Sequence, residues 1–279
     1  MPSGLRTLLY RWWTRIAPSA GPLVLRANTL GGRGYHLGAV APARVSGYCV
    51  YRRRNAQVVS EFVAGWPPHT AIHLHALDAT ADELRSATLS SGPGDRMPLL
   101  QRLIDTHPPR PGDIVMIFDD DVVFVGGGAD RIAGLMTTAG FDIAQPAHVA
   151  SSNLNYKVTE VVPLMTAREV GYVEVGPVVL FSPRAQAWVL PFPADARMGW
   201  GVDVSWTLLR DKGIRLGVID ATTIRHLGTV GTAYDNAAEE RFQAPFLARA
   251  GVGSAQELAG NTGATWRPWQ RRPRWHRAG

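Results

Sequence analysis

Three consecutive carboxylates are the feature of this sequence most suited to chemistry. Asp119, Asp120 and Asp121 follow the strongly apolar segment 113–118. Adjacent carboxylates repel one another unless something neutralises them, and a divalent cation held by oxygen ligands is the commonest solution. In an extended segment Asp119 and Asp121 point one way and Asp120 the other, which suits two ligands on one metal, or one metal ligand and one ribose contact. Apolar residues on both sides of the triplet argue against the alternative, a solvated turn with a helix-capping Asp.

The segments around the triplet predict a sheet that would position it. Before the triplet, the patterns predict strands at 45–51, 70–77 and 113–118 and helices at 56–64 and 97–106. After it, they predict a helix at 129–140, a short strand at 141–145, a set of strands within 158–181, a helix that starts at Ser182-Pro183, and a strand at 214–219. Strands that alternate with helices imply an α/β fold with a parallel sheet, whose ligands bind beyond the carboxyl ends of the strands. The triplet lies at such an end.

The composition narrows the class of protein. The chain has 279 residues, 46% of them hydrophobic, which suits one large globular domain or two small ones. No apolar run approaches the roughly 20 residues of a membrane-spanning helix. The single cysteine, Cys49, excludes an intramolecular disulfide and a multi-cysteine zinc site, so a reducing cytoplasm is the expected compartment.

Charge is segregated along the chain. Residues 1–60 contain nine Arg and no acid, residues 261–279 contain five Arg and no acid, and residues 61–260 carry a net charge of −8. A protein that grips nucleic acid through its folded body would show a basic body, so we expect no nucleic-acid partner. The acidic body is better suited to holding cations.

Both basic ends also contain tryptophans. Trp12 and Trp13 lie among N-terminal arginines, and Trp266, Trp269 and Trp275 alternate with C-terminal ones. Trp rings settle at headgroup depth and Arg is attracted to anionic lipid, so these ends predict attachment to an anionic membrane surface. An ordinary solvated tail is the alternative. No signal peptide is visible at the N-terminus, and we expect a cytoplasmic protein, peripheral at the inner face of the membrane.

Residues 45–230 resemble the nucleotide-sugar-dependent glycosyltransferases of the GT-A fold, and are most like the family-2-like enzymes in pattern. Asp119-Asp120-Asp121 matches the family's Asp-x-Asp motif, which ends a strand and binds metal and ribose. Asp203 matches an acidic residue at a helix start that faces the acceptor, although Val202 stands where the family often has Glu. His226 matches the histidine that completes the metal site in many members.

The resemblance implies a fold and a reaction. The fold would be GT-A (Rossmann-like), a mixed, mainly parallel sheet flanked by helices in a single catalytic domain. The reaction would move a sugar from a nucleoside-diphosphate sugar to an acceptor hydroxyl on a glycan, a lipid-linked molecule or a small molecule, with hexosyl transfer as the expected subtype. It would depend on Mn²⁺ or Mg²⁺, which Asp121 and His226 would bind, and Asp119 would help to bind either the metal or the ribose. A core or surface histidine is the alternative for His226.

The resemblance also assigns acceptor-side roles. Asp203 would take the proton from the attacking hydroxyl in an inverting mechanism, and a helix N-cap is its ordinary alternative. Trp200, beside Gly201, would offer a flat face on which a sugar ring or aglycone stacks, with core packing as the alternative.

The donor nucleotide is expected at the ends of the first two strands. The basic run at 52–54 would pair with a diphosphate or form a solvated loop. Asp78 resembles the family's base-binding acidic position, and Arg96 lies where the family has a nucleotide-contacting loop. The predicted nucleotide-sugar-binding residues are Tyr51, Arg52, Asp78, Arg96, Asp119 and Asp120.

The predicted organisation has four parts: a basic N-terminal extension at 1–44, the catalytic domain at 45–230, a C-terminal helical segment at 231–260 and a basic Trp/Arg-rich tail at 261–279. Two other functions fit parts of the sequence. The apolar strand end and Asp-x-Asp-x-Val pattern at 118–123 are also typical of haloacid-dehalogenase-like phosphatases, but no suitable later lysine is followed by an acidic pair. The other is a catalytically inactive sugar-nucleotide-binding or membrane-associated protein.

Overall fold

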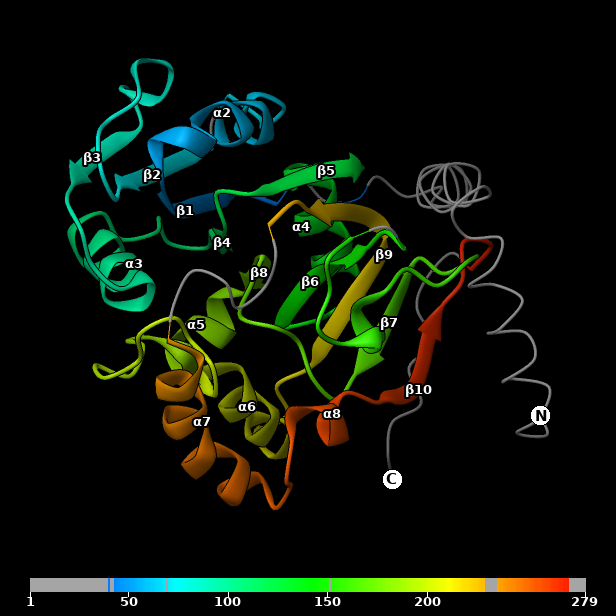
Figure 1. Ribbon diagram of the computed structural model, residues 1–279. Coiled ribbons are helices and arrows are strands. Elements are labelled where there is room, and N and C mark those ends of the chain that lie inside the picture. The colour runs from blue at the N-terminus through cyan, green and yellow to red at the C-terminus, as the bar shows by residue number, and fades with distance from the viewer. Residues whose placement is uncertain (1–39, 41–42, 69, 151, 229–234, 271–279) are drawn as a thin grey trace.

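The computed structural model describes residues 40, 43–68, 70–150, 152–228 and 235–270 (Figure 1). Nearly all of the predicted N-terminal extension at 1–44 and the end of the predicted tail, 271–279, lie outside these residues. None of the described helices is both long and apolar enough to cross a membrane.

One mixed sheet organises the described part of the chain. Its strands are β1 (Val45–Tyr51), β2 (Ala71–Ala76), β3 (Thr88–Ser91), β4 (Ile114–Phe118), β5 (Val122–Gly126), β6 (Ile143–His148), β7 (Ala167–Val170), β8 (Val178–Phe181), β9 (Leu216–His226) and β10 (Asn261–Trp266). They lie in the order β10-β7-β9-β6-β8-β4-β1-β2-β3, and β5 pairs with β9 off this path. The strands β3, β2, β1 and β4 are parallel to one another, and β8 joins β4 to β6 with antiparallel pairing on both sides.

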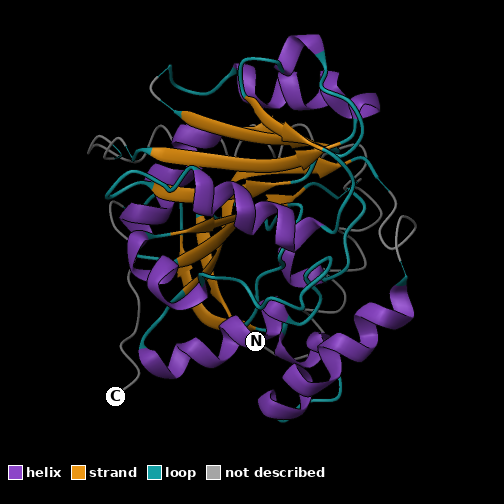
Figure 2. Ribbon diagram, turned by 90° about the vertical axis from the view of Figure 1, so that its left-hand side faces the viewer, coloured by secondary structure: helices purple, strands orange, loops and turns teal. Residues whose placement is uncertain are grey.

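Helices cover both faces of this sheet (Figure 2). They are α2 (Ala56–Ala64), α3 (Arg96–Thr106), α4 (Ala129–Ala139), α5 (Pro183–Val189), α6 (Val202–Leu208), α7 (Asn236–Ala250) and α8 (Ala255–Leu258). Apolar side chains of α2 and α4 pack in one core, and those of α3, α5 and α6 pack in another. Every residue of β1 and β4 is buried, as expected for central strands covered on both faces. The predicted α/β class and the helix-flanked mixed sheet are confirmed.

Two strands differ from the sequence expectation in ways that matter for the site. The strand predicted at 214–219 begins at Leu216 and continues to His226. The buried polar residues Asp220, Thr222 and Thr223 interrupt the apolar pattern, and the pairing with β6 resumes at Thr223 after a register shift. Asp220 is compensated by the guanidinium of Arg168 at 2.9 Å. Within 158–181, only the short strands β7 and β8 form.

The predicted tail at 261–279 requires a correction. Its first residues form β10, which pairs antiparallel with β7 (Figure 1). The side chain of Trp266 is fully buried in the core, and its indole nitrogen donates to the carbonyl of Gln270. Trp266 is therefore unavailable to a membrane interface, because it completes the edge of the sheet. Trp269, in contrast, is 56% exposed.

We expect the replacement Trp266→Ala to lower the free energy of unfolding by about 3–5 kcal/mol, because it leaves a large cavity beneath β10. Trp269→Ala is the matched control, and its effect should stay within about 0.5 kcal/mol because that ring is mostly exposed. Urea unfolding of both variants measures the difference. Equal effects would show that the C-terminal segment behaves as the predicted tail after all.

Candidate active site

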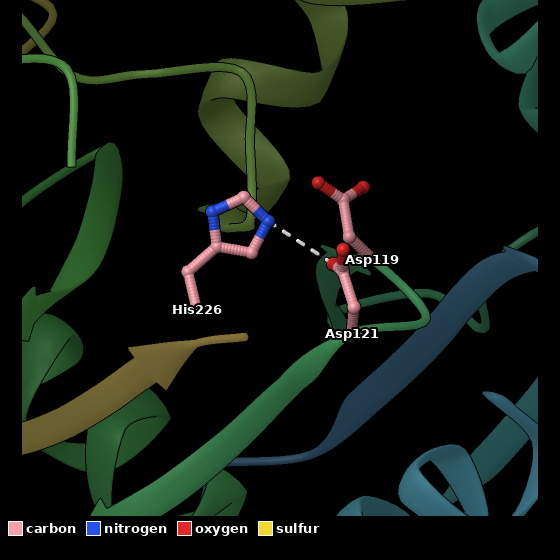
Figure 3. A group of neighbouring side chains, drawn as sticks. All are labelled: Asp119, Asp121 and His226. Atoms are coloured by element: carbon pink, nitrogen blue, oxygen red, sulfur yellow. Dashed lines mark hydrogen bonds and ion pairs between the residues drawn. The ribbon is translucent and has the colours of Figure 1, made fainter. Parts of the chain in front are cut away.

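The carboxylate triplet lies in the turn between β4 and β5. Asp119 directly follows β4, and Asp121 directly precedes β5. Because β5 pairs antiparallel with β9, Val122 lies opposite His226 at the end of β9. This register brings Asp121 Oδ1 within 3.1 Å of His226 Nε2, although the residues are 105 positions apart (Figure 3). One donor atom from each of Asp119, Asp121 and His226 lies within 4.8 Å of the others.

Two basic side chains, Arg96 and His226, lie against this carboxylate pair. Arg96 Nε and Nη2 lie 2.8 and 2.7 Å from Asp119 Oδ1. Burial raises the pKa of Asp119, although Arg96 opposes the rise. Burial alone would lower the pKa of His226, but the hydrogen bond and charge of Asp121 raise it above its ordinary value. His226 in turn lowers the pKa of Asp121 against the effect of burial. The cluster thus stabilises positive charge.

Two glycines leave space for the carboxylates of Asp119 and Asp121, and this bears on whether a divalent cation fits here. A Cβ on Gly176 would lie 2.7 Å from Asp119 Oδ2, and a Cβ on Gly228 would lie 2.0 Å from Asp121 Oδ2. Only glycine leaves room for both carboxylates in these positions. Two carboxylates and an imidazole, cradled in this way and already attracting positive charge, fit a divalent cation such as Mn²⁺ or Mg²⁺.

Asp120 engages a different partner from its two neighbours. Its buried carboxylate accepts a 2.8 Å hydrogen bond from the backbone nitrogen of Arg52, whose guanidinium lies 3.8 Å away. Asp120 therefore ties the end of β4 to the loop after β1, in keeping with the alternation of side chains along an extended chain.

A cavity of about 840 Å³ opens at the carboxyl ends of β1 and β4. Of the predicted site residues, the cavity is lined by Arg52, Arg96, Asp119, Asp120, Asp121, Trp200, Asp203 and His226. On the side of the cavity formed by β1 to β4 and the loops that follow these strands, the lining also includes Val50, Leu77 and residues 94–96. We call this side the donor wall. The opposite wall comes from residues after β6 and β7, from the start of α6, and from α7 and α8.

Three predicted residues lie outside the set of described residues that line this cavity. The buried hydroxyl of Tyr51 contacts Thr88 Oγ1 at 2.9 Å, inside the core beside β3. Asp78 Oδ1 accepts hydrogen bonds from the backbone nitrogens of Arg53 and Ala79 at 2.9 and 2.8 Å. Both residues shape the loops at the ends of β1 and β2.

Gly201 is the third, and it permits a close approach between helices. It adopts a left-handed conformation with φ of 88°, and a Cβ there would lie 2.8 Å from Gln243 Cα in α7. Gly201 therefore occupies the N-cap position of α6 that was the alternative role for Asp203.

Asp203 lies in the first turn of α6, where it is 5% exposed. Its Oδ2 accepts hydrogen bonds from the Tyr172 hydroxyl at 2.6 Å and from the Val175 backbone nitrogen at 3.3 Å. Its Oδ1 accepts from the backbone nitrogens of Gly201 and Val204. Burial raises the pKa of Asp203 to about 6, and these hydrogen bonds restrain the rise. These hydrogen bonds fix the orientation of the carboxylate.

Two buried glutamates at the site were not predicted from the sequence. Glu239 in α7 is 1% exposed, and its carboxylate accepts from the backbone nitrogens of Met198 and Trp200, so it holds the turn that leads to Asp203. Glu174 lines the cavity and accepts from Asn155 Nδ2 at 3.3 Å. Burial raises the pKa of Glu174 to about 8. No local pattern marks either residue, because the sequence does not show that α7 and the segment between β7 and β8 return to the site.

Comparisons with known proteins bear on the fold. No protein-family model and no curated protein matches the sequence. Among solved structures, the crystal structure of GalNAc-T7 with UDP, GalNAc and Mn²⁺ is similar at a TM-score of 0.54 and 6% identity, over 74% of this chain and 48% of that chain. The chain thus spans about half the length of that relative.

Two further solved structures give lower scores. A mycobacterial protein matches at a TM-score of 0.46 and 14% identity, over 86% of this chain and 87% of that one. TarS of S. aureus matches at a TM-score of 0.44 and 11% identity, over 77% of this chain and 44% of that chain. The strand order and the likeness to GalNAc-T7 together show that the chain has a GT-A-type glycosyltransferase fold.

Proposed function

We propose that this protein transfers a sugar from a nucleoside-diphosphate sugar to an acceptor hydroxyl, in a reaction that depends on a divalent cation. The observation that carries the proposal is the meeting of Asp119, Asp121 and His226 in a cavity at the carboxyl end of β4, within a GT-A-type fold. The similar GalNAc-T7 structure contains UDP, GalNAc and Mn²⁺, which supports the same class of donor and ion here. A hexosyl group is the sugar we expect.

Asp119, Asp121 and His226 would hold the cation. When bound, Mn²⁺ or Mg²⁺ supplies Lewis-acid stabilisation of the negative charge that develops on the departing diphosphate. Arg52 and Arg96 line the donor wall, and we assign both to the diphosphate. Asp120 would keep Arg52 in place through its hydrogen bond to the backbone of that residue.

Asp203 is assigned as the general base. In an inverting transfer, the acceptor oxygen bonds to the anomeric carbon while the bond from that carbon to the diphosphate breaks, and the hydroxyl proton passes to Asp203. A base with a pKa of about 6 is ionised at neutral pH and still basic enough to accept a proton. Trp200 lines the same cavity and would contact the acceptor.

A thermal-shift panel tests this proposal. UDP-, GDP- and TDP-sugars are each added with and without Mn²⁺, and at least one should raise the melting temperature markedly more with Mn²⁺ than without it, because a ligand that binds only the folded state stabilises it. The haloacid-dehalogenase-like alternative is disfavoured by the GT-A-type fold, and turnover of p-nitrophenyl phosphate is its test. A panel without any stabilising sugar nucleotide would contradict the proposed function.

Membrane attachment remains a separate part of the proposal. We propose a cytoplasmic protein that contacts an anionic membrane through its basic ends, but most of those residues lie outside the described part of the chain. Of the C-terminal tryptophans, Trp269 is exposed and has the Arg267 guanidinium 5.7 Å from its ring centre. Trp266 no longer belongs to this surface because it is buried.

A further inference from the structure

The charged groups in the cavity are divided between its two walls. Three arginines line it, and each pairs with an aspartate of the donor wall: Arg52 with Asp120 at 3.8 Å, Arg96 with Asp119 at 2.7 Å, and Arg197 with Asp95 at 3.0 Å. Arg197 belongs to the turn before Trp200, but its guanidinium pairs with Asp95. Among the described cavity-lining residues in the loops after β6 and β7 and in α6, α7 and α8, there is no lysine or arginine. The arginines of the cavity are therefore all paired with carboxylates on the side that we assign to the diphosphate.

The opposite side carries a different set of side chains. We define the acceptor wall by six of its residues, which are Asn155, Tyr156, Glu174, Trp200, Glu240 and Gln243. Tyr156 and Trp200 provide aromatic surface, and the Tyr156 ring is supported by that of Tyr172, 4.8 Å away between centres. The side chains of Glu240 and Gln243 make no hydrogen bond to any other described residue, so their polar ends are available to a ligand.

Packing fixes this wall relative to the proposed base. Phe246 and Leu247 of α7 pack against an apolar cluster that includes Val204 of α6. The close approach of α7 at Gly201 leaves no space for a Cβ there. Glu239 adds hydrogen bonds from α7 to the turn before α6. A hydroxyl presented to Asp203 would therefore bring the rest of its molecule against α7.

The groups on the acceptor wall suit one kind of ligand. Aromatic faces pack against the apolar faces of sugar rings, and amides and carboxyl groups pair with the hydroxyls at the ring edge. At neutral pH Glu174 is an uncharged carboxyl that both donates and accepts, because burial raises its pKa to about 8. A phosphate group needs cations or several N–H donors when it leaves water, and the described cavity lining on this side offers no cation.

We infer that the acceptor wall binds the acceptor as an uncharged sugar and rejects acceptors that carry a phosphate next to the accepting hydroxyl. This inference rests on the proposed function, because it assigns the opposite wall to the donor. It selects one of the open acceptor classes, a glycan or glycoside, and makes Glu240 a specificity-determining residue.

Saturation-transfer NMR on the full chain with UDP and Mg²⁺ tests the inference. The probes are the methyl glycosides of glucose, galactose, mannose and N-acetylglucosamine, each compared with its own 6-phosphate. We expect saturation transfer to at least one uncharged glycoside, at least about tenfold stronger than to its phosphate, because like charges brought together weaken binding. Equal or stronger signals from the phosphates would overturn the inference, as would the absence of a signal from every glycoside.

A charge-reversing variant with a matched control sharpens the test. Glu240→Lys should reduce the preference for the uncharged glycoside, whereas Glu83→Lys makes the same charge change at an exposed position outside the cavity and should leave the preference unchanged. An unchanged preference in Glu240→Lys would contradict the role of Glu240. Calorimetric titration with UDP and Mn²⁺ examines the donor side separately, so a failure of the proposed function can be told from a failure of this inference.

Discussion

Replacing Asp121 by alanine should abolish sugar transfer and remove the Mn²⁺-dependent part of UDP binding. Asp121 contributes a carboxylate to the cluster and is hydrogen-bonded to His226, so its loss removes one proposed ligand and the partner of another. Changes to groups around a metal already cost 10–100-fold in affinity, and we expect loss of a direct ligand to weaken Mn²⁺ binding by about 100-fold or more. Calorimetric titration of UDP with and without Mn²⁺, and electron paramagnetic resonance of Mn²⁺, measure these effects.

The fold should survive this change. Removing Asp121 relieves repulsion within the triplet but also removes the hydrogen bond to His226, so the melting temperature of Asp121→Ala without metal should change only slightly. Asp211→Ala, at an exposed position in the turn after α6, is the matched control and should retain Mn²⁺ binding. Wild-type activity that persists in excess EDTA would refute metal dependence, and normal Mn²⁺ binding by Asp121→Ala would refute this ligand assignment.

Asp203→Asn should lower kcat by at least about 100-fold with little change in donor affinity, because the amide keeps the size of the side chain but cannot accept the proton. The pH profile gives a second readout. The base is active when ionised, so wild-type activity should fall as the pH decreases through about 6, the pKa that burial gives to Asp203. Steady-state kinetics between pH 5 and pH 8 measure both effects.

Two comparisons separate catalysis from structure in this experiment. Asp195→Asn makes the same chemical change at an exposed loop position nearby and should leave kcat unchanged. Tyr172→Phe removes the 2.6 Å hydrogen bond that stabilises the ionised form of Asp203, so the acid limb of the pH profile should move to higher pH. Near-normal turnover by Asp203→Asn would leave Asp203 a structural role or indicate a retaining mechanism.

Local patterns in the sequence were enough to predict the core of the fold and two of the three residues of the candidate metal site. The continuous apolar run at β4 is the expected signal of a buried central strand, and it places Asp119 and Asp121 at a carboxyl end where ligands bind. Alternation along an extended chain predicted that Asp120 would differ from its neighbours, and its bond to the loop after β1 agrees with that. These inferences needed only neighbours a few positions away.

The family resemblance named His226 as the third residue of this site, and the tertiary structure shows how it comes to face those carboxylates. His226 reaches Asp121 because β5 pairs with β9 in a particular register, and polar residues within β9 concealed the strand that carries it. The return of α7 places Glu239 under the turn before Asp203 and Glu240 on the opposite wall, although both look like ordinary surface residues of a helix. Trp266 looked like part of a basic tail until β10 paired with β7. Periodicity reports which face of its own element a residue occupies, whereas strand register and helix docking depend on contacts between residues far apart in the chain, and those contacts assemble the site.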